Sequence, residues 1–210
     1  MTRILHTSDL HLHTSDHVDR LIERLGRNDF DVWCDTGDLL PDMPTYVSAE
    51  AAGQREWMTI MLLRERITKA LQGRPGLLAP GNHDAFVVAP FGEIPEGFVI
   101  NYAGFVSPDL SHFRRYNHRV QATPNGIAYH LNQRLDNAKV LLTHAPPRGC
   151  PAAKECEHSD YGCHDLPEVL RPGLTVLCGH VHKPFARDCD YRGARIINSA
   201  RRNTVFSVEI

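Results

Sequence analysis

The stretch RILHTSDLH, residues 3–11, joins an apolar run to a cluster of polar side chains that follows it directly. Residues 3–7 have the composition of a short buried strand. Asp9 and His11 come after it, two positions apart, so in an extended segment both side chains would point to the same side. The stretch therefore predicts a strand whose end presents a carboxylate and an imidazole to one centre.

Four further apolar runs end in the same way. Residues 32–34 lead into Asp35-Thr36-Gly37-Asp38, residues 77–79 precede Gly81-Asn82-His83-Asp84, residues 139–143 precede His144, and residues 174–178 precede Gly179-His180-Val181-His182. In α/β sheets, ligands gather beyond the carboxyl ends of strands, where loops converge while the sheet stays rigid. The five strand ends therefore predict a single site.

The side chains at these ends suit metal ions. His180 and His182 have the same two-residue spacing as the first pair, so they can also share one centre. Asp38 offers two oxygens and can bridge two cations. Asn82 adds a neutral oxygen, which suits a hard ion of high coordination number. Glycines at positions 37, 81 and 179 allow the backbone to turn sharply beside the site.

The remaining pattern predicts a mixed α/β layered fold. We expect a helix capped by Asp16 that ends at Gly26 or Asn28, and a long helix over residues 48–72. Further β segments are expected at 98–105, 120–131 (with an Asn125-Gly126 hairpin turn), 195–197 and 204–208, and a short helix at 166–170. An early βαβα order followed by a β-rich half indicates packed layers. No repeat or linker divides the chain, so residues 1–210 are expected to form one domain.

Composition excludes several classes of protein. With 23 basic and 25 acidic residues among 210, the formal charge of −2 argues against a nucleic-acid binder that works by bulk charge. No apolar run approaches the roughly 20 residues needed to span a membrane, and the N-terminus lacks the apolar region of a signal peptide. We therefore expect a cytoplasmic protein with no membrane partner. The 13 histidines are the one oddity, and several of them fall at the strand ends.

The ordered set D-x-H, GD, GNHD, H and GHxH, from Asp9 to His182, resembles the calcineurin-like metallophosphoesterase superfamily. This resemblance implies an α/β fold, a four-layer αββα sandwich of two mixed β-sheets flanked by helices. It also implies two divalent metal ions. Their mixed nitrogen and oxygen ligands suit Mn, Fe or Zn, and the sequence does not choose among these.

The resemblance also assigns roles to individual residues. It gives one metal to Asp9, His11, Asp38 and His182, and the other to Asp38, Asn82, His144 and His180, so that Asp38 bridges. Two cations about 3.5–4 Å apart would lower the pKa of a shared water, and the bridging hydroxide would attack phosphorus in line with the leaving group. His83 is then the general acid, and its catalytic neighbour Asp84 either orients it or caps a helix.

The branch of the superfamily is indicated by departures from its patterns. The stretch Gly37-Asp38-Leu39-Leu40-Pro41-Asp42 lacks the GDxxDRG signature of protein serine/threonine phosphatases. Asp42 lies one position after the place where this signature has its second aspartate. Residues 3–9 and 179–184 look like the DNA-repair exonuclease branch, whose chains are much longer. The compact length and residues 162–166 look more like small phosphodiesterases of the cyclic-nucleotide type.

We therefore expect a phosphodiesterase that acts on a nucleotide or another small phosphodiester. The alternatives within the superfamily are a nuclease, with nucleic acid as substrate, and a nucleotide phosphomonoesterase. A non-catalytic metal-binding interaction scaffold is the alternative from another class. Candidate substrate contacts are His13, Arg148, Lys183, Asn198 and Arg201. Each also has a simpler interpretation. His13 would be an exposed loop histidine, the arginines and the lysine would be solvated surface charges, and Asn198 would support a turn.

A Cys- and His-containing loop spans residues 145–165 within the domain. Cys150, Cys156, His158 and Cys163 could hold a structural zinc ion, although their spacing is not that of a standard zinc knuckle. Free thiols or a disulfide are the alternatives. Cys34 and Cys178 end apolar strands and are expected to be small core residues.

Overall fold

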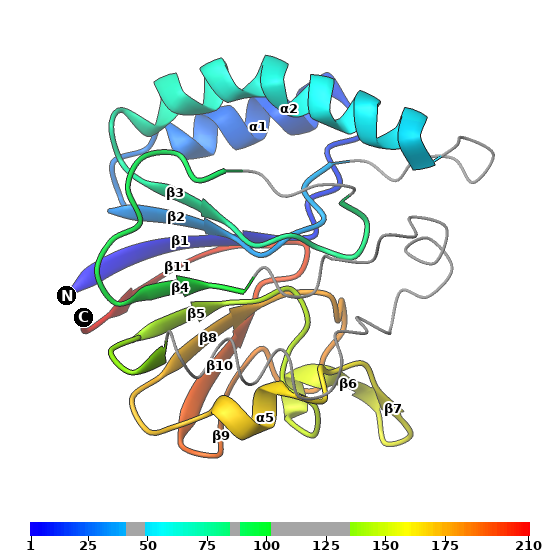
Figure 1. The fold of residues 1–210 in the computed structure, drawn as a ribbon, viewed down its shortest axis with the longest axis vertical. Helices are drawn as coiled ribbons and strands as arrows, with labels where there is room; N and C mark the ends of the chain where they lie inside the picture. The colour runs from blue at the N-terminus through cyan, green and yellow to red at the C-terminus, as the bar shows by residue number, and fades with distance from the viewer. Residues whose placement is uncertain (41–48, 85–88, 102–134) are drawn as a thin grey trace.

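The computed structural model of the chain describes residues 1–40, 49–84, 89–101 and 135–210, whose strands form two main sheets (Figure 1). The first sheet has the order β11 (Arg202–Val208), β1 (Thr2–Ser8), β2 (Val32–Asp35), β3 (Gly76–Leu78). The second has the order β4 (Phe98–Ile100), β5 (Val140–Leu142), β8 (Thr175–Cys178), β10 (Ala194–Asn198), β9 (Asp188–Tyr191). Edge strands β11 and β9 run antiparallel to their neighbours and the other pairs are parallel, so both sheets are mixed.

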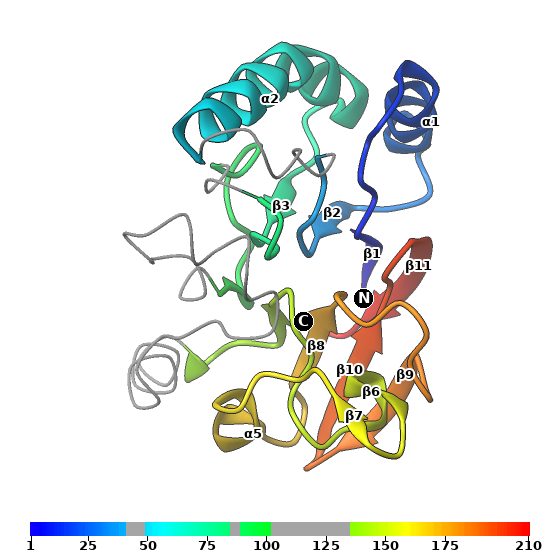
Figure 2. The same ribbon diagram turned by 90° about the vertical axis from the view of Figure 1, so that its right-hand side faces the viewer.

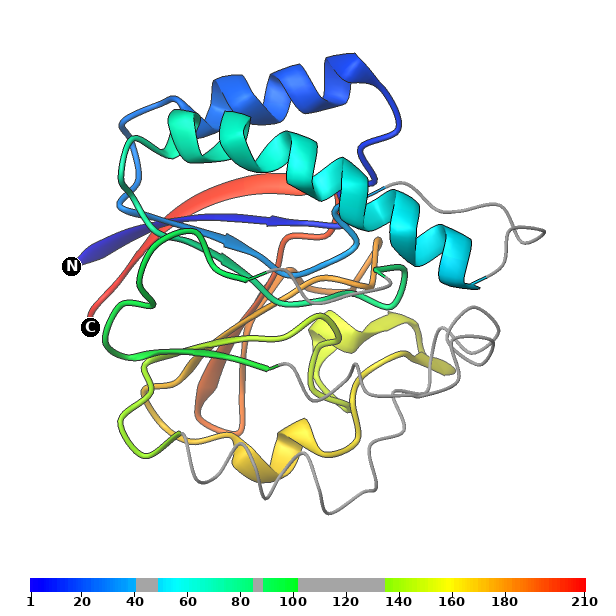
Figure 3. The ribbon, with the colours of Figure 1, turned by 45° about the horizontal axis from the view of Figure 1, so that its top comes forward.

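Helices cover the outer faces of the two sheets. The helices α1 (Ser15–Leu25) and α2 (Ala49–Leu71) run side by side over the first sheet (Figure 3). The short helix α5 (Leu166–Val169) and the hairpin of β6 (Lys154–Cys156) and β7 (Ser159–Asp160) lie beyond the second sheet (Figure 2). The predicted four-layer αββα sandwich is therefore confirmed.

Alternate residues of the strands enter different core layers. On β1, Ile4 packs between the two sheets, whereas Leu5 packs beneath the helices α1 and α2. On β5, Val140 and Leu142 face the space between the sheets, and Leu141 faces the outer core under α5. Because successive side chains point to opposite faces, a strand buried on both faces must be apolar throughout. This explains why the buried strands read as continuous apolar runs.

Several local predictions need correction. Asp16 does not cap α1: the N-cap is Thr14, whose Oγ1 accepts a hydrogen bond from the His17 backbone N at 3.3 Å, and Asp16 lies in the first turn. Strand β9 was not predicted. The segment 145–165 is more ordered than a loop, since it contains β6, β7 and the 3₁₀ helix η1 (Pro151–Ala153). Asp42, residues 102–105 and the expected β segment 120–131 lie outside the described residues.

His6, on β1, is fully buried below the polar strand ends. Its Nε2 lies 3.0 Å from Thr36 Oγ1, while its Nδ1 has no hydrogen-bond partner in the part of the chain that the structure describes. Burial lowers the pKa of His6 to about 3, so the ring is neutral in the folded state at any ordinary pH.

This burial predicts a loss of stability in mild acid. Below about pH 6.5 the unfolded chain binds a proton at His6 that the folded chain does not, so stability falls as pH falls. Between about pH 7 and about pH 5.5 we expect metal-free wild type to lose about 1 kcal/mol more unfolding free energy than His6→Leu. Urea unfolding at both pH values measures this, with the exposed His158→Leu as a control that should behave like wild type. Equal losses in wild type and His6→Leu would contradict the prediction.

Candidate metal centre

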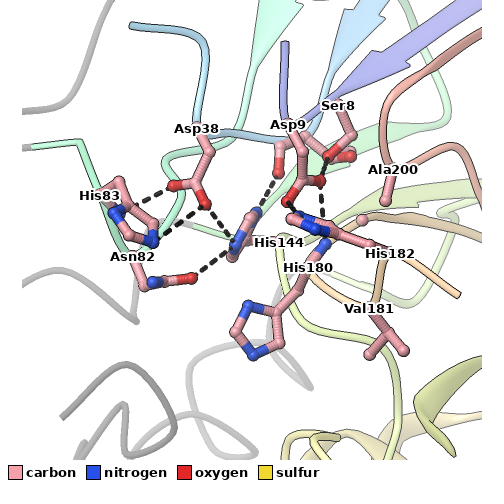
Figure 4. A network of polar contacts seen from close by, with 12 residues as sticks. Ser8, Asp9, Asp38, Asn82, His83, His144, His180, Val181, His182 and Ala200 are labelled. Atoms are coloured by element: carbon pink, nitrogen blue, oxygen red, sulfur yellow. Dashed lines mark hydrogen bonds and ion pairs between the residues drawn. The ribbon is translucent and has the colours of Figure 1, made fainter. Parts of the chain in front are cut away.

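The loops that follow β1, β2, β5 and β8 meet at one place and are joined by hydrogen bonds (Figure 4). The Asp9 backbone N donates to Gly37 O at 2.9 Å, which joins two loops of the first sheet. The His180 backbone N donates to Asp9 Oδ2 at 2.9 Å, and His144 Nδ1 donates to Thr36 O at 2.7 Å. The last two contacts connect the second sheet to the first, so the cluster is built from both.

Four of the seven predicted metal ligands have left-handed backbone conformations. The φ angles are 53° at Asp9, 42° at His11, 55° at Asp38 and 64° at His180. The expectation that Asp9 and His11, or His180 and His182, lie on extended segments is therefore wrong: β1 ends at Ser8 and β8 ends at Cys178. Such conformations cost about 1–3 kcal/mol each and typically cluster at functional sites. Strained turns, not strand alternation, aim these side chains.

Two glycines allow the loops to approach closely. A Cβ at Gly179 would lie 1.8 Å from Ser8 Oγ and 2.3 Å from Asp9 Oδ2. A Cβ at Gly81 would lie 2.1 Å from Asp38 Oδ1. Any side chain at either position would collide with a central carboxylate, so glycine is required here for space.

The donor atoms form two overlapping groups. In one, ligand atoms of Asp9, His11 and His182 lie within 4.8 Å of one another, and in the other those of Asp9, Asp38 and His144 do. Asp9 belongs to both groups, whereas the sequence predicted Asp38 as the shared carboxylate. Asn82 and His180 lie beside the second group: Asn82 Oδ1 is 2.8 Å from His144 Nε2, and the ring centroids of His144 and His180 are 5.0 Å apart.

Asp9 is a buried carboxylate that stays ionised. Burial alone would raise its pKa, but hydrogen bonds from His182, Ser8 and the His180 backbone N, together with the charge of His144, hold the pKa well below its usual range. Its Oδ1 lies 3.1 Å from His182 Nε2, and its Oδ2 accepts from Ser8 Oγ at 2.6 Å. The site therefore keeps a fixed negative charge at its centre.

The ring of His144 lies among oxygen atoms that favour a positive charge on or beside its Nε2. Its Nδ1–H donates to a backbone carbonyl, so Nε2 is the atom that faces Asn82 Oδ1 at 2.8 Å and Asp38 Oδ2 at 3.3 Å. Although burial lowers the pKa of His144, the carboxylates of Asp38 and Asp9 raise it to about 10. Two oxygens therefore converge on one ring nitrogen, and either a proton on that nitrogen or a metal ion among the three atoms would satisfy them. The mixed nitrogen and oxygen donors fit divalent ions of the Mn, Fe or Zn type.

His83 and Asp84, both predicted as catalytic, are placed differently. The His83 backbone N donates to Asp38 Oδ1 at 2.7 Å, and its Nε2 lies 4.0 Å from Asp38 Oδ2, so the ring borders the cluster. Asp84 Oδ2 accepts from the backbone N of Asp38 at 2.9 Å and of Gly81 at 2.7 Å. Burial, together with the charge of Asp38, raises the pKa of Asp84 to about 6. Its contacts are those of a residue that ties two loops together.

The five candidate substrate contacts separate into two kinds. His13 is exposed and stacks on His11 with ring centroids 5.9 Å apart, and Arg201, also exposed, donates its backbone N to Ser8 O at 2.9 Å. Both therefore border the cluster. The Arg148 side chain pairs with His164, whereas Lys183, next to the predicted ligand His182, donates its backbone N to Glu155.

Asn198 is 2% exposed and engages the backbone instead of facing solvent. Its Oδ1 accepts from the Ala200 N at 2.9 Å, and its Nδ2 lies within 3.3 Å of three carbonyls, those of Ala152, Gly179 and Val181. These contacts are those of a residue that supports a turn.

The candidate zinc residues of the loop are not gathered. Cys150 is buried, Cys163 is partly buried, and Cys156 and His158 are exposed, with Cys156 Sγ 2.9 Å from Ser159 Oγ. Within the described residues, every group of three or more potential ligands belongs to the cluster around Asp9. All six cysteines are free thiols, and Cys34 and Cys178 lie in the core as expected.

Sequence reasoning missed three residues that shape the cluster. Ser8 donates to Asp9, and Thr36 accepts from His144 through its carbonyl. The Arg187 guanidinium donates to the backbone carbonyls of His182, Asn198 and Ala200. Ser8 stands next to a predicted ligand, which is a usable signal. The Thr36 carbonyl and Arg187, which lies five residues beyond the GHxH motif, carry no such signal in the sequence.

Residues 2–184 match the family model described as calcineurin-like phosphoesterase. A dimetal phosphatase from Danio rerio has a similar fold, with a TM-score of 0.54 and 12% sequence identity over 94% of this chain and 86% of that one. Phosphopantetheinyl hydrolase from Mycobacterium tuberculosis gives a TM-score of 0.40 and 16% identity over 92% and 86%. No curated protein matches the chain in sequence.

In the described part of the chain, no helix combines the length and apolar character needed to cross a membrane.

Proposed function

The chain belongs to the calcineurin-like phosphoesterase family, and we propose that it hydrolyses a phosphodiester with two divalent metal ions held around Asp9 and Asp38. Membership makes it a metal-dependent phosphoesterase, and the type of ester and the roles of single residues are the proposal. The observation that carries it is the pair of overlapping donor groups, Asp9 with His11 and His182, and Asp9 with Asp38 and His144.

In this proposal, each ion is held by one donor group and its neighbours. His11 and His182 hold the first with Asp9, and His144 holds the second together with the adjacent Asn82 and His180. Asp38 remains our candidate bridge, and the position of Asp9 in both groups makes it the alternative. Two divalent ions bound there would supply a water of lowered pKa and positive charge for the phosphate oxygens.

His83 is proposed to protonate the leaving oxygen. Its backbone N is fixed to Asp38 Oδ1, which holds the ring at the edge of the cluster without placing it in either donor group. Its Nε2 lies 4.0 Å from Asp38 Oδ2. General acid catalysis of this kind contributes about 10²–10⁴-fold to the rate.

The preference for a diester over a monoester rests on the sequence. The stretch Gly37–Asp42 lacks the GDxxDRG signature of protein serine/threonine phosphatases, and residues 162–166 look like those of small phosphodiesterases. A nucleotide or another small phosphodiester is the substrate class we propose.

One domain is sufficient for this function in our proposal. The cluster takes donors from loops of both sheets, and β1 pairs with β11 near the C-terminus. The two sheets therefore have to fold together before the donors can meet, and residues 1–210 act as one unit.

A comparison of three substrates tests the proposal. Metal-free protein is supplied with Mn²⁺, Fe²⁺ or Zn²⁺ and given a chromogenic bis-aryl phosphate, the matching aryl monoester and single-stranded DNA. We expect metal-dependent hydrolysis, with kcat/KM for the diester above that for the monoester. A higher kcat/KM for the monoester would replace the diester assignment, and cleavage of DNA alone would replace the small diester by nucleic acid as the substrate. Metal binding without hydrolysis of any ester would favour the scaffold.

A further inference from the structure

Two side chains hold the turn Gly179–His182, which we call the GHVH turn. Arg187 Nη1 donates to Ala200 O at 3.1 Å and to Asn198 O at 3.4 Å, and Arg187 Nη2 donates to His182 O. Asn198 Nδ2 lies 3.0 Å from Gly179 O and 3.1 Å from Val181 O. Three carbonyls of the turn are therefore fixed by two side chains from outside it.

The GHVH turn needs this support because secondary structure does not supply it. It begins after β8 ends at Cys178, and β9 starts only at Asp188. The turn is tight, with His180 in a left-handed conformation and the Val181 N donating to Gly179 O at 2.7 Å. The orientation of His182, which brings Nε2 to 3.1 Å from Asp9 Oδ1, thus depends on contacts made by its backbone.

The guanidinium of Arg187 is well suited to this task. It is partly buried, and its acceptors are carbonyls on two separate segments, His182 on one side and residues 198 and 200 on the other. A planar fork of donors can reach both segments at once, whereas the single ammonium of lysine is a point donor. Arg187 also donates no hydrogen bond to a carboxylate in the described structure, so its role at the site is exerted through the backbone.

We propose that Arg187 is a positioning residue that sets His182 for the metal ion held with Asp9 and His11. This inference rests on the proposed function. The second donor group is held by other contacts, since His144 bonds to Thr36 O and Asp38 is fixed by Asp84. His180 lies in the GHVH turn beside that group, but its backbone N bonds to Asp9 Oδ2, and Asn198 holds the carbonyls of Gly179 and Val181 on either side of it. Loss of Arg187 should therefore weaken the first metal position and leave the second in place.

Metal binding to the full chain tests the inference directly. Metal-free wild type, Arg187→Met, Arg187→Lys and Arg195→Met are titrated with Mn²⁺ by calorimetry, and Co²⁺ spectra report the ligand geometry. Arg195 is the matched control, because it lies on β10, pairs with Asp188 at the surface and lies over the ring of Phe206. Ligand-supporting residues typically change metal affinity 10–100-fold, so Arg187→Met should bind one ion normally and the other about 10–100-fold more weakly. Arg187→Lys should fall between Arg187→Met and wild type, and the control should match wild type.

Chemical rescue separates positioning from general destabilisation. In Arg187→Ala, millimolar guanidinium should restore the weakened metal position, whereas the same concentration of sodium chloride should not. Two ions bound with wild-type affinity in Arg187→Met would overturn the inference. Equal weakening of both ions without rescue would also overturn it, since that result indicates a purely structural role. A wild type that binds no metal would instead overturn the proposed function.

Discussion

Replacement of Asp9 by asparagine is expected to remove both metal ions and to lower kcat/KM by at least about 10³-fold. Asp9 is the one residue common to both donor groups, and its carboxylate is buried and ionised. Asparagine has nearly the same shape but offers a single neutral oxygen. That oxygen can still accept from the His180 N, so the loops should stay in place while the charge that attracts the ions is lost.

Metal content and activity are measured on the same samples. Elemental analysis after dialysis should give two ions per chain for wild type and less than one for Asp9→Asn. Asp31→Asn is the matched control, because Asp31 lies on the surface and pairs with Arg3. It should keep both ions and full activity. An Asp9→Asn protein with two tightly bound ions would contradict the placement of the centre.

Replacement of His83 by glutamine is expected to keep both ions and to lower kcat by about 10²–10⁴-fold. The ring of His83 lies outside both donor groups, and its backbone N, which any residue supplies, makes the bond to Asp38 Oδ1. Loss of the ring therefore removes a proton donor and leaves the ligands untouched. Because a good leaving group needs little protonation, the defect should shrink as the leaving group becomes more acidic.

A series of aryl diesters with leaving groups of different pKa measures this effect. The slope of log kcat against leaving-group pKa should be steeper for His83→Gln than for wild type. The exposed His158→Gln serves as the control and should show the wild-type slope. Unchanged activity in His83→Gln would remove its role as general acid, and loss of a metal ion would make it a ligand instead.

The layers of the fold were predictable because they depend on patterns of several residues. The apolar runs at residues 3–7, 32–34 and 139–143 all lie in strands of the structure. A strand that is buried on both faces is apolar throughout, so such runs are easy to identify in the sequence. Strand β9 was missed because its residues, Asp188–Tyr191, are polar and partly exposed at the edge of the sheet. Edge strands are held by one neighbour and need little apolar surface.

The site was predictable in its residue types but not in its geometry. Polar residues after strands indicated where Asp9, Asp38 and His144 would meet. The left-handed conformations that aim them depend on glycines and on contacts between loops, and non-glycine residues rarely signal such a conformation in sequence. Arg187 and Thr36 act on or through backbone carbonyls, which every residue carries, so the pattern of side chains could not reveal their partners.

A stoichiometric Mn²⁺ titration of metal-free protein shows whether the cluster around Asp9 is the two-metal phosphodiesterase centre that we propose. Hydrolysis of a bis-aryl phosphate is followed as metal is added. We expect no hydrolysis without metal, and a rate that rises with added metal and reaches its plateau at two ions per chain. Hydrolysis that is unaffected by metal removal, or full binding of two ions with no hydrolysis, would contradict this proposal.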